Sequence, residues 1–264
     1  MRGFLVLLAV ALVASACGFK RYVWFISIGY GVAVAAIGVA LLAMFGARSG
    51  VAEVLQALLL VAYGCRLAGY LAYRELRSRS YNQKMKGEVK GNDSVTLGAR
   101  LAIWGAAALL YACQTSPVLF RMAAHARTDV LLVVGLAVSA FGLAFETTAD
   151  VQKNAAKRRN PRRFVDTGLF RIVRCPNYLG EMLFWTGVFV SGVGVYAGIA
   201  QWAAALVGYL GIVYVMFGGA RRLEIRQNRS YGKDPAYQRY VRTTPIMLPF
   251  VPLYSVEKHK WLVA

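Results

Sequence analysis

Residues 130–149 read VLLVVGLAVSAFGLAFETTA, and this stretch decides the fold class because it carries no charge before Glu146. A run of about 20 apolar residues is long enough to cross the hydrocarbon core of a bilayer. Inside lipid only a helix or a closed barrel satisfies its own backbone hydrogen bonds, and this stretch lacks the alternation of a barrel strand. We therefore expect a membrane-spanning helix here.

Six further apolar runs lie on either side of this one. They are residues 3–18, 23–46, 51–73, 97–119, 178–196 and 200–220. The sequence thus predicts an all-α polytopic integral membrane protein with seven transmembrane helices, forming a single domain over residues 1–264. The composition agrees, because 58% of the residues are hydrophobic and only 16% are charged, too few to cover a soluble globule. The first run is short for a span, so six spans with a peripheral first segment are the alternative.

The charges orient these spans. Lysines and arginines number 31 against 12 aspartates and glutamates, a formal net charge of +19. In a soluble protein this excess would indicate nucleic acid, but beside apolar spans it indicates the positive-inside rule and no nucleic-acid partner. Most of these cations fall in residues 74–100, 150–176 and 221–264, which seven spans place on one side. The N-terminus is therefore expected outside and the C-terminus in the cytoplasm, in a bacterial inner membrane or the endoplasmic reticulum.

The most polar chemistry lies where a basic loop enters the sixth span. Pro176 suits the first turn of a helix, and Asn177 and Glu181 then lie one turn apart on one face. Three arginines stand before this turn: Arg163, Arg171 and Arg174. Guanidinium groups beside a helix N-terminus make a site for phosphate or carboxylate. The alternative is that these arginines only follow the positive-inside rule and contact lipid headgroups.

Carboxylates inside apolar spans favour the first interpretation. Glu181 in the sixth span, and Glu146 with Asp150 in the fifth, are costly in lipid and are therefore functional candidates. Both spans direct these groups toward the same basic loop. Carboxylate and amide groups can bind ribose hydroxyls while arginines bind phosphates, so this mixture of side chains favours a nucleotide ligand.

The run GLFRIVRCPNYLGEMLFWTG, residues 168–187, resembles the C-terminal motif of the steroid 5-alpha-reductase-like membrane family, whose usual form is G-L-[WF]-x-x-x-R-H-P-N-Y-x-G-E. The likeness extends upstream to Gln152 and downstream through Tyr237 to TPIMLP, residues 244–249. It continues more weakly in YGCRLAGYLAYRE, residues 63–75, and CQTSPV, residues 113–118. The resemblance covers most of the chain.

This resemblance implies a seven-helix bundle that binds NADPH from the cytoplasm and reduces the carbon–carbon double bond of an enone lipid, such as a 3-oxo-Δ4-steroid. Residues 150–264 would form the NADPH-binding half, and residues 1–149 the substrate-side helices. The cofactor contacts carried over by position are Asp150, Arg163, Arg174, Asn177, Tyr178, Glu181, Glu224 and Tyr240. Cys175 stands where the family most often has histidine, and we interpret it as a small neutral replacement rather than a nucleophile.

Reduction of an enone places negative charge on the carbonyl oxygen, which needs a hydrogen-bond donor. In the third span Tyr63, Arg66, Tyr70 and Tyr73 fall on one helical stripe. We expect Tyr70 or Tyr73 to donate the proton to a hydrophobic substrate that enters from the membrane lipid. The alternative is an interfacial aromatic belt with Arg66 extended toward water.

Two rival functions stay open. An S-adenosylmethionine-dependent methyltransferase of the isoprenylcysteine or phospholipid type has a similar arrangement on its last helices, but its methyl donor carries no phosphate. A non-catalytic sterol-binding protein would not require Asn177, Glu181 and Glu224 together. Gln114 and Glu53 are weaker polar candidates on the substrate side. The four cysteines lack paired spacing, so no metal site is predicted.

Overall fold

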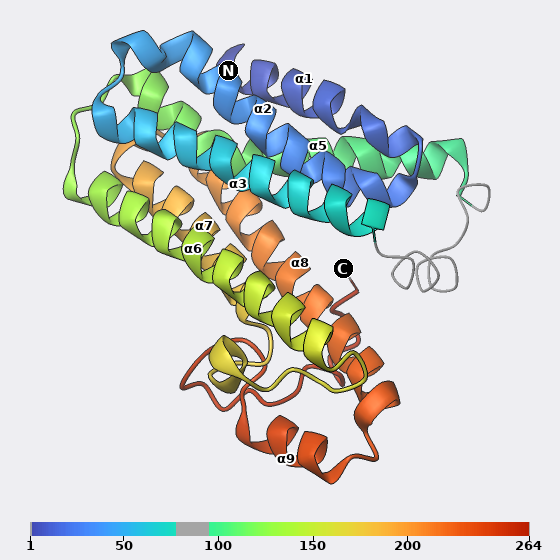
Figure 1. Ribbon diagram of the computed structural model, residues 1–264. Helices are drawn as coiled ribbons and strands as arrows, with labels where there is room; N and C mark the ends of the chain where they lie inside the picture. Colours follow the sequence, from blue (N-terminus) through green and yellow to red (C-terminus); the bar gives the residue numbers. More distant parts are fainter. Residues whose placement is uncertain (1, 78–94, 264) are drawn as a thin grey trace. The chain divides into compact units, whose positions relative to one another are not determined.

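The computed structural model describes residues 2–77 and 95–263. Over these ranges the chain forms helices and no β-strand (Figure 1). The α-helices are α1 (Arg2–Ser15), α2 (Ile28–Phe45), α3 (Val51–Arg77), α5 (Leu97–Ala124), α6 (Val130–Arg159), α7 (Pro176–Gly192), α8 (Ile199–Tyr231) and α9 (Pro235–Thr243). Short 3-10 turns are η1 (Ala16–Phe19), η2 (Tyr22–Ile26), η3 (Gly46–Arg48), η5 (Gly168–Arg171) and η6 (Val193–Val195). The basic residues predicted for the loop after the third span lie partly at 78–94, outside the described residues.

Seven helical segments of the described chain are long and apolar enough to cross a membrane, which confirms the all-α polytopic prediction. The first segment, Arg2–Phe19, is one of the seven. Large apolar side chains stay exposed along these helices, among them Leu58, Val133, Phe141 and Leu210. Such extended apolar surface is unfavourable in water and is the surface expected of helices that face lipid.

Two helices run well past the ends that the apolar pattern predicted. Helix α6 continues beyond residue 149 to Arg159, and α8 continues beyond residue 220 to Tyr231. The apolar pattern marks only the part suited to lipid, whereas the following alanines, glutamines and cations are still good helix formers. Basic residues in the last turn of α6 also interact favourably with the negative end of the helix dipole.

The described chain falls into two compact units. Unit 1 comprises Met1–Leu136 and Val188–Gly208, and unit 2 comprises Ala137–Gly187 and Tyr209–Ala264. In unit 1, helices α1, α2, α3 and α5 pack side by side (Figure 1). A Cβ atom on Gly31 would lie 2.6 Å from the backbone nitrogen of Ala68, so only glycine lets α2 approach α3 this closely.

In unit 2, a glycine likewise allows a close approach between α6 and α7. A Cβ atom on Gly180 would lie 2.6 Å from the backbone nitrogen of Glu146, so the two helix backbones are in contact at this point. One turn along, the Ser139 hydroxyl donates a hydrogen bond of 3.2 Å to the carbonyl of Phe184. The start of α7 is therefore fixed against α6 in unit 2.

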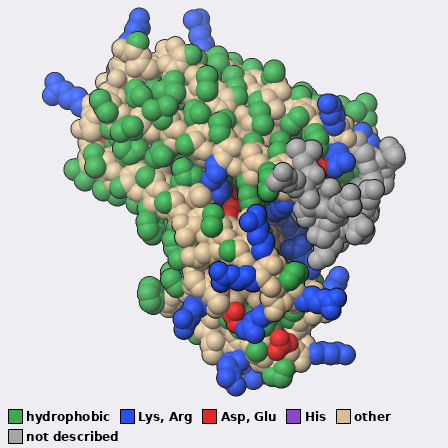
Figure 2. Space-filling view, in the orientation of Figure 1, with side chains coloured by type: hydrophobic (Ala, Val, Ile, Leu, Met, Phe, Trp, Pro, Cys, Tyr) green, Lys and Arg blue, Asp and Glu red, His purple; other side chains and the backbone are tan. Residues whose placement is uncertain are grey.

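The segment before α7 is also tied to the C-terminal part of the chain. The backbone N–H groups of Arg174 and Cys175 donate to the carbonyls of Pro245 and Ile246, both at 2.9 Å. Figure 2 shows lysine and arginine side chains gathered over α9 and the loops beside it, while hydrophobic side chains predominate over the long helices. Backbone hydrogen bonds between segments far apart in sequence thus hold the polar residues before α7 in place.

Candidate functional site

A buried ion pair holds the polar part of unit 2 together. Arg174 Nη2 donates to Glu224 Oε1 at 2.8 Å, and each side chain is only 1% exposed. The same nitrogen donates to the carbonyl of Tyr254, and Glu224 Oε2 accepts a hydrogen bond of 2.9 Å from the N–H of Val256. This pair joins the segment before α7, helix α8 and the C-terminal segment. Nε and Nη1 of Arg174 have no hydrogen-bond partner among the described residues.

The first turns of α7 carry the amide and the carboxylate that the sequence singled out. Asn177 is half-buried, and its Oδ1 has no hydrogen-bond partner in the described part of the chain. Glu181 is buried, as are Glu146 and Asp150 on α6. Because the Gly180 backbone touches that of Glu146, the acidic stretches of the two helices lie next to each other. The structure therefore brings together the two acidic faces that the sequence indicated.

The loop between α6 and α7 is held in a defined shape. Arg163 and Asp166 form an ion pair of 2.7 Å, and Gln152 Oε1 accepts a hydrogen bond of 2.8 Å from the N–H of Leu169. Gly168 has a φ angle of +62°, a left-handed conformation that favours glycine. A side chain at Gly168 would also overlap the amide of Gln152. The glycine of the sequence motif is thus required by the local backbone.

Aromatic rings form the wall between this loop and α9. The ring of Phe164 stacks on that of Tyr240 at a centroid distance of 5.4 Å and meets the edge of Tyr237 at 5.2 Å. The Tyr240 hydroxyl donates to the carbonyl of Phe170 at 2.7 Å, and that of Tyr237 donates to Asn228 Oδ1 at 2.8 Å. Burial raises the pKa of Tyr237 to about 12 and that of Tyr240 further, so both hydroxyls remain donors at neutral pH.

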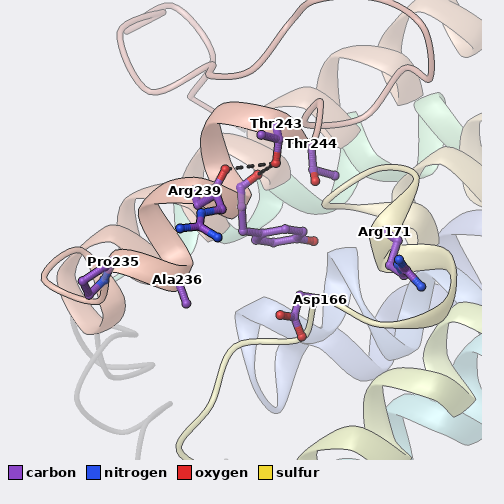
Figure 3. A pocket seen from close by; sticks show the side chains of 8 residues that line it. Asp166, Arg171, Pro235, Ala236, Arg239, Thr243 and Thr244 are labelled. Carbon is purple, nitrogen blue, oxygen red and sulfur yellow. Dashed lines mark hydrogen bonds between the residues drawn. The ribbon is translucent and has the colours of Figure 1, made fainter.

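Two open pockets in unit 2 share Asp166 as a lining residue. The larger, about 420 Å³, is lined by Arg171, by Arg239, Tyr240 and Thr243 of α9 and by Thr244 just after it (Figure 3), and we call it the Arg239 pocket. The smaller, about 340 Å³, includes Arg163 in its wall and is here the Arg163 pocket; its other polar lining residues are Gln152, Arg159, Asn160 and Thr167. Both volumes fall in the range of small-molecule sites, roughly 300 to 1,000 Å³.

Tyrosines in unit 1 differ sharply in exposure. Tyr73 is 51% exposed, and the ring of Tyr70 lies 5.7 Å from the guanidinium of Arg74. Tyr63, on the same helix, is completely buried and donates a hydrogen bond of 3.1 Å to the hydroxyl of Tyr30 on α2. The Tyr30 ring in turn stacks on Tyr111 of α5 at 4.9 Å. The sequence placed Tyr63 on the stripe of the third span, but it offered no signal that Tyr63 meets Tyr30 and Tyr111, because the three residues come from separate helices.

Cys175 has the environment of a structural side chain. Its side chain is buried, and its backbone N–H is bonded to the Ile246 carbonyl. Burial raises the pKa of the Cys175 thiol to about 12, with the nearby Arg174 charge acting in the opposite direction. The thiol is therefore neutral at physiological pH and lacks the thiolate that a nucleophile needs.

The predicted site residues divide between the units. Every residue predicted to contact the cofactor lies in unit 2, whereas Tyr70 and Tyr73 lie in unit 1. Arg163 and Tyr240 line pockets, Arg174 and Glu224 pair with each other, and Tyr178 packs its ring against Gly219 of α8. Arg239 was not predicted as a site residue, because it belongs to no motif; its one-turn spacing from Thr243 was the available signal.

A family model described as "Protein of unknown function (DUF1295)" matches residues 16–244. This family is related to steroid 5-alpha-reductase-like proteins. No curated protein and no solved structure matches the chain. The match covers helices α2 to α9 and every residue predicted to contact the cofactor, whereas α1 and the C-terminal segment that binds Arg174 and Glu224 lie outside it.

Proposed function

We propose that this chain, which belongs to the DUF1295 family, is a membrane-embedded NADPH-dependent reductase of the carbon–carbon double bond of an enone lipid. The proposed substrate class is a 3-oxo-Δ4-steroid or a similar sterol-like ketone. One observation carries the proposal. Residues spread from Asp150 to Tyr240, which the family resemblance links to a nucleotide, fall in a single compact unit that has two arginine-lined pockets.

The side chains of unit 2 fit a phosphorylated nucleotide. Buried Arg174 and half-buried Asn177 each carry polar atoms with no hydrogen-bond partner in the described chain, and such atoms are costly unless a ligand or water pairs with them. Guanidinium groups bind phosphate oxygens, and the amide of Asn177 and the carboxylates of Asp150 and Glu181 suit ribose hydroxyls or a carboxamide. The buried pair between Arg174 and Glu224 would keep this surface in place.

NADPH, when bound, would supply a hydride for the β-carbon of the enone. The protein must then stabilise the negative charge on the carbonyl oxygen and deliver a proton to the α-carbon. Tyr70 and Tyr73 remain the proposed donors. The buried hydroxyls of Tyr63 and Tyr30, which are hydrogen-bonded to each other, are a second candidate for this donor. Hydroxyls shielded from water interact more strongly with a developing charge.

The pocket chemistry also favours NADPH over S-adenosylmethionine. Arg171 and Arg239 line the Arg239 pocket, and Arg163 lines the other pocket that contains Asp166. A methyl donor with one carboxylate and a sulfonium group has no phosphate to pair with several guanidinium groups. The same argument weighs against a purely sterol-binding role, which requires no anion site.

Reduction of a steroid enone by the full-length protein in lipid nanodiscs tests the proposal. We expect NADPH consumption that depends on a 3-oxo-Δ4-steroid and a product heavier by two hydrogens. Asn177→Ala should weaken NADPH binding about 10- to 100-fold, because a hydrogen bond to the nucleotide is lost. Gln238→Ala, an exposed amide on α9, is the matched control and should leave binding unchanged. Equal binding by both variants would show that the site is elsewhere.

A further inference from the structure

The Arg239 pocket contains two arginines that come from different segments of unit 2. One face of α9 supplies Pro235, Arg239 and Thr243, which follow one another at one-turn spacing, and the loop before α7 supplies Asp166 and Arg171 (Figure 3). The two arginines come from segments about 70 residues apart in sequence, since the fold alone brings α9 to this loop. The fold, and not a single basic stretch of the sequence, therefore brings the two arginines to one pocket.

The charges of this pocket do not cancel. Its one carboxylate, Asp166, is already paired with Arg163, which lies outside the Arg239 pocket. Arg171 and Arg239 are both exposed, and the structure gives neither an ion pair within the described residues. The pocket thus presents two guanidinium groups whose charge is available to a ligand.

The other polar groups of the pocket are occupied or uncharged. The Thr243 hydroxyl donates to the carbonyl of Arg239 at 3.0 Å, and the Tyr240 hydroxyl donates to the carbonyl of Phe170 at 2.7 Å. Thr244 is buried. The two arginines are therefore the main groups that select a ligand, and two guanidinium groups match a doubly charged phosphomonoester better than a singly charged diester.

We propose that the Arg239 pocket binds the 2′-phosphate of NADPH, so that Arg171 and Arg239 set the preference for NADPH over NADH. This inference rests on the proposed function. The two dinucleotides differ only by this phosphomonoester, and Tyr240, a residue predicted to contact the cofactor, lines the same pocket. With about 420 Å³, the pocket has room for a ribose as well as the phosphate.

Equilibrium binding to the full-length protein in detergent tests this role without measuring activity. The ligands are NADPH, NADH and adenosine 2′,5′-bisphosphate, and the variants are Arg171→Ala, Arg239→Ala and the double variant. We expect each single change to weaken NADPH and the bisphosphate about 10-fold or more, while NADH affinity stays the same. Arg242→Ala removes another exposed arginine of α9, one that lies outside the pocket, and should change none of the three affinities.

Each other outcome has a distinct meaning. If the unaltered protein binds NADPH and NADH equally, or if the variants keep its preference, the role of the pocket is overturned while the proposed function stands. If it binds neither dinucleotide, the proposed function fails and the inference fails with it. Phosphatidylglycerol added to the detergent micelles is a fourth ligand. If the double variant loses affinity only for this lipid, the phosphate belongs to a lipid headgroup, and the cofactor role is overturned.

Discussion

A buried ion pair in unit 2 contrasts with two buried polar side chains in unit 1 that have no hydrogen-bond partner among the described residues. In unit 2 the charges of Arg174 and Glu224 meet, and the pair also binds the backbone of the C-terminal segment. In unit 1 the carboxylate of Glu53 and the amide of Gln114 are buried, and neither has a hydrogen-bond partner among the described residues. The pair of Arg174 and Glu224 therefore holds segments of unit 2 together, whereas Glu53 and Gln114 of unit 1 cost stability unless a ligand or water pairs with them.

Breaking the buried pair should have the largest effect on stability. Glu224→Ala leaves Arg174 buried without its carboxylate, and we expect a loss of about 3–5 kcal/mol in the free energy of unfolding. Titration with sodium dodecyl sulfate in mixed micelles measures it. The control is Asp166→Ala, which breaks a pair whose arginine is 51% exposed and should cost less than about 1 kcal/mol. Similar losses in both variants would contradict a structural role for the buried pair.

The sequence was sufficient to predict the membrane spans but not to predict which residues of the candidate site bind each other. Uninterrupted apolar runs predict helices in lipid because no other single segment satisfies its backbone there. They do not predict that α6 and α8 continue beyond lipid, since that depends on helix propensity and on the contacts of unit 2. The family resemblance predicted Arg174 and Glu224 as nucleotide contacts, but no local pattern could show that these residues, 50 positions apart, bind each other.

The helix contact in unit 2 provides the next test. Gly180→Ala would place a methyl group against the Glu146 backbone, and overpacking of this kind costs about 1–3 kcal/mol. Gly105→Ala is the matched control, because its added Cβ meets nothing within 4 Å beyond its own stretch of helix, and we expect it to keep stability or to raise it by up to about 1 kcal/mol. Thermal unfolding in detergent distinguishes the two. A harmless Gly180→Ala would mean that α6 and α7 are less tightly packed than described.

Removing an unpaired polar group from unit 1 should raise the free energy of unfolding instead of lowering it. Gln114→Met keeps the shape of the side chain while removing an amide that has no hydrogen-bond partner in the described chain. We expect a gain of about 1 kcal/mol in the free energy of unfolding without ligand, because the desolvation cost disappears. The same detergent titration measures it. A loss of stability would instead reveal a partner for this amide and would weaken the contrast between the units.

The smallest expected effect is on the labelling of the Cys175 thiol, whose reaction with a maleimide should not change with pH. The raised pKa of Cys175, about 12, keeps its thiol protonated, so raising the pH from about 7 to about 10 should not increase its reaction with a maleimide in the folded protein. Cys65 in unit 1 is exposed and should react with a membrane-permeable maleimide. Mass spectrometry of peptides reports both sites. Rapid labelling of Cys175 at neutral pH would mean that the segment before α7 opens readily.

Thermal unfolding of the detergent-purified protein with NADPH, NADH and S-adenosylmethionine in turn tests the central claim most directly, since a ligand that binds only the folded state raises the unfolding midpoint. We predict a concentration-dependent rise with NADPH, a smaller one with NADH and none with S-adenosylmethionine. A rise with S-adenosylmethionine alone would assign the protein to the methyltransferases. No rise with any of the three would contradict the account of unit 2 as a nucleotide site.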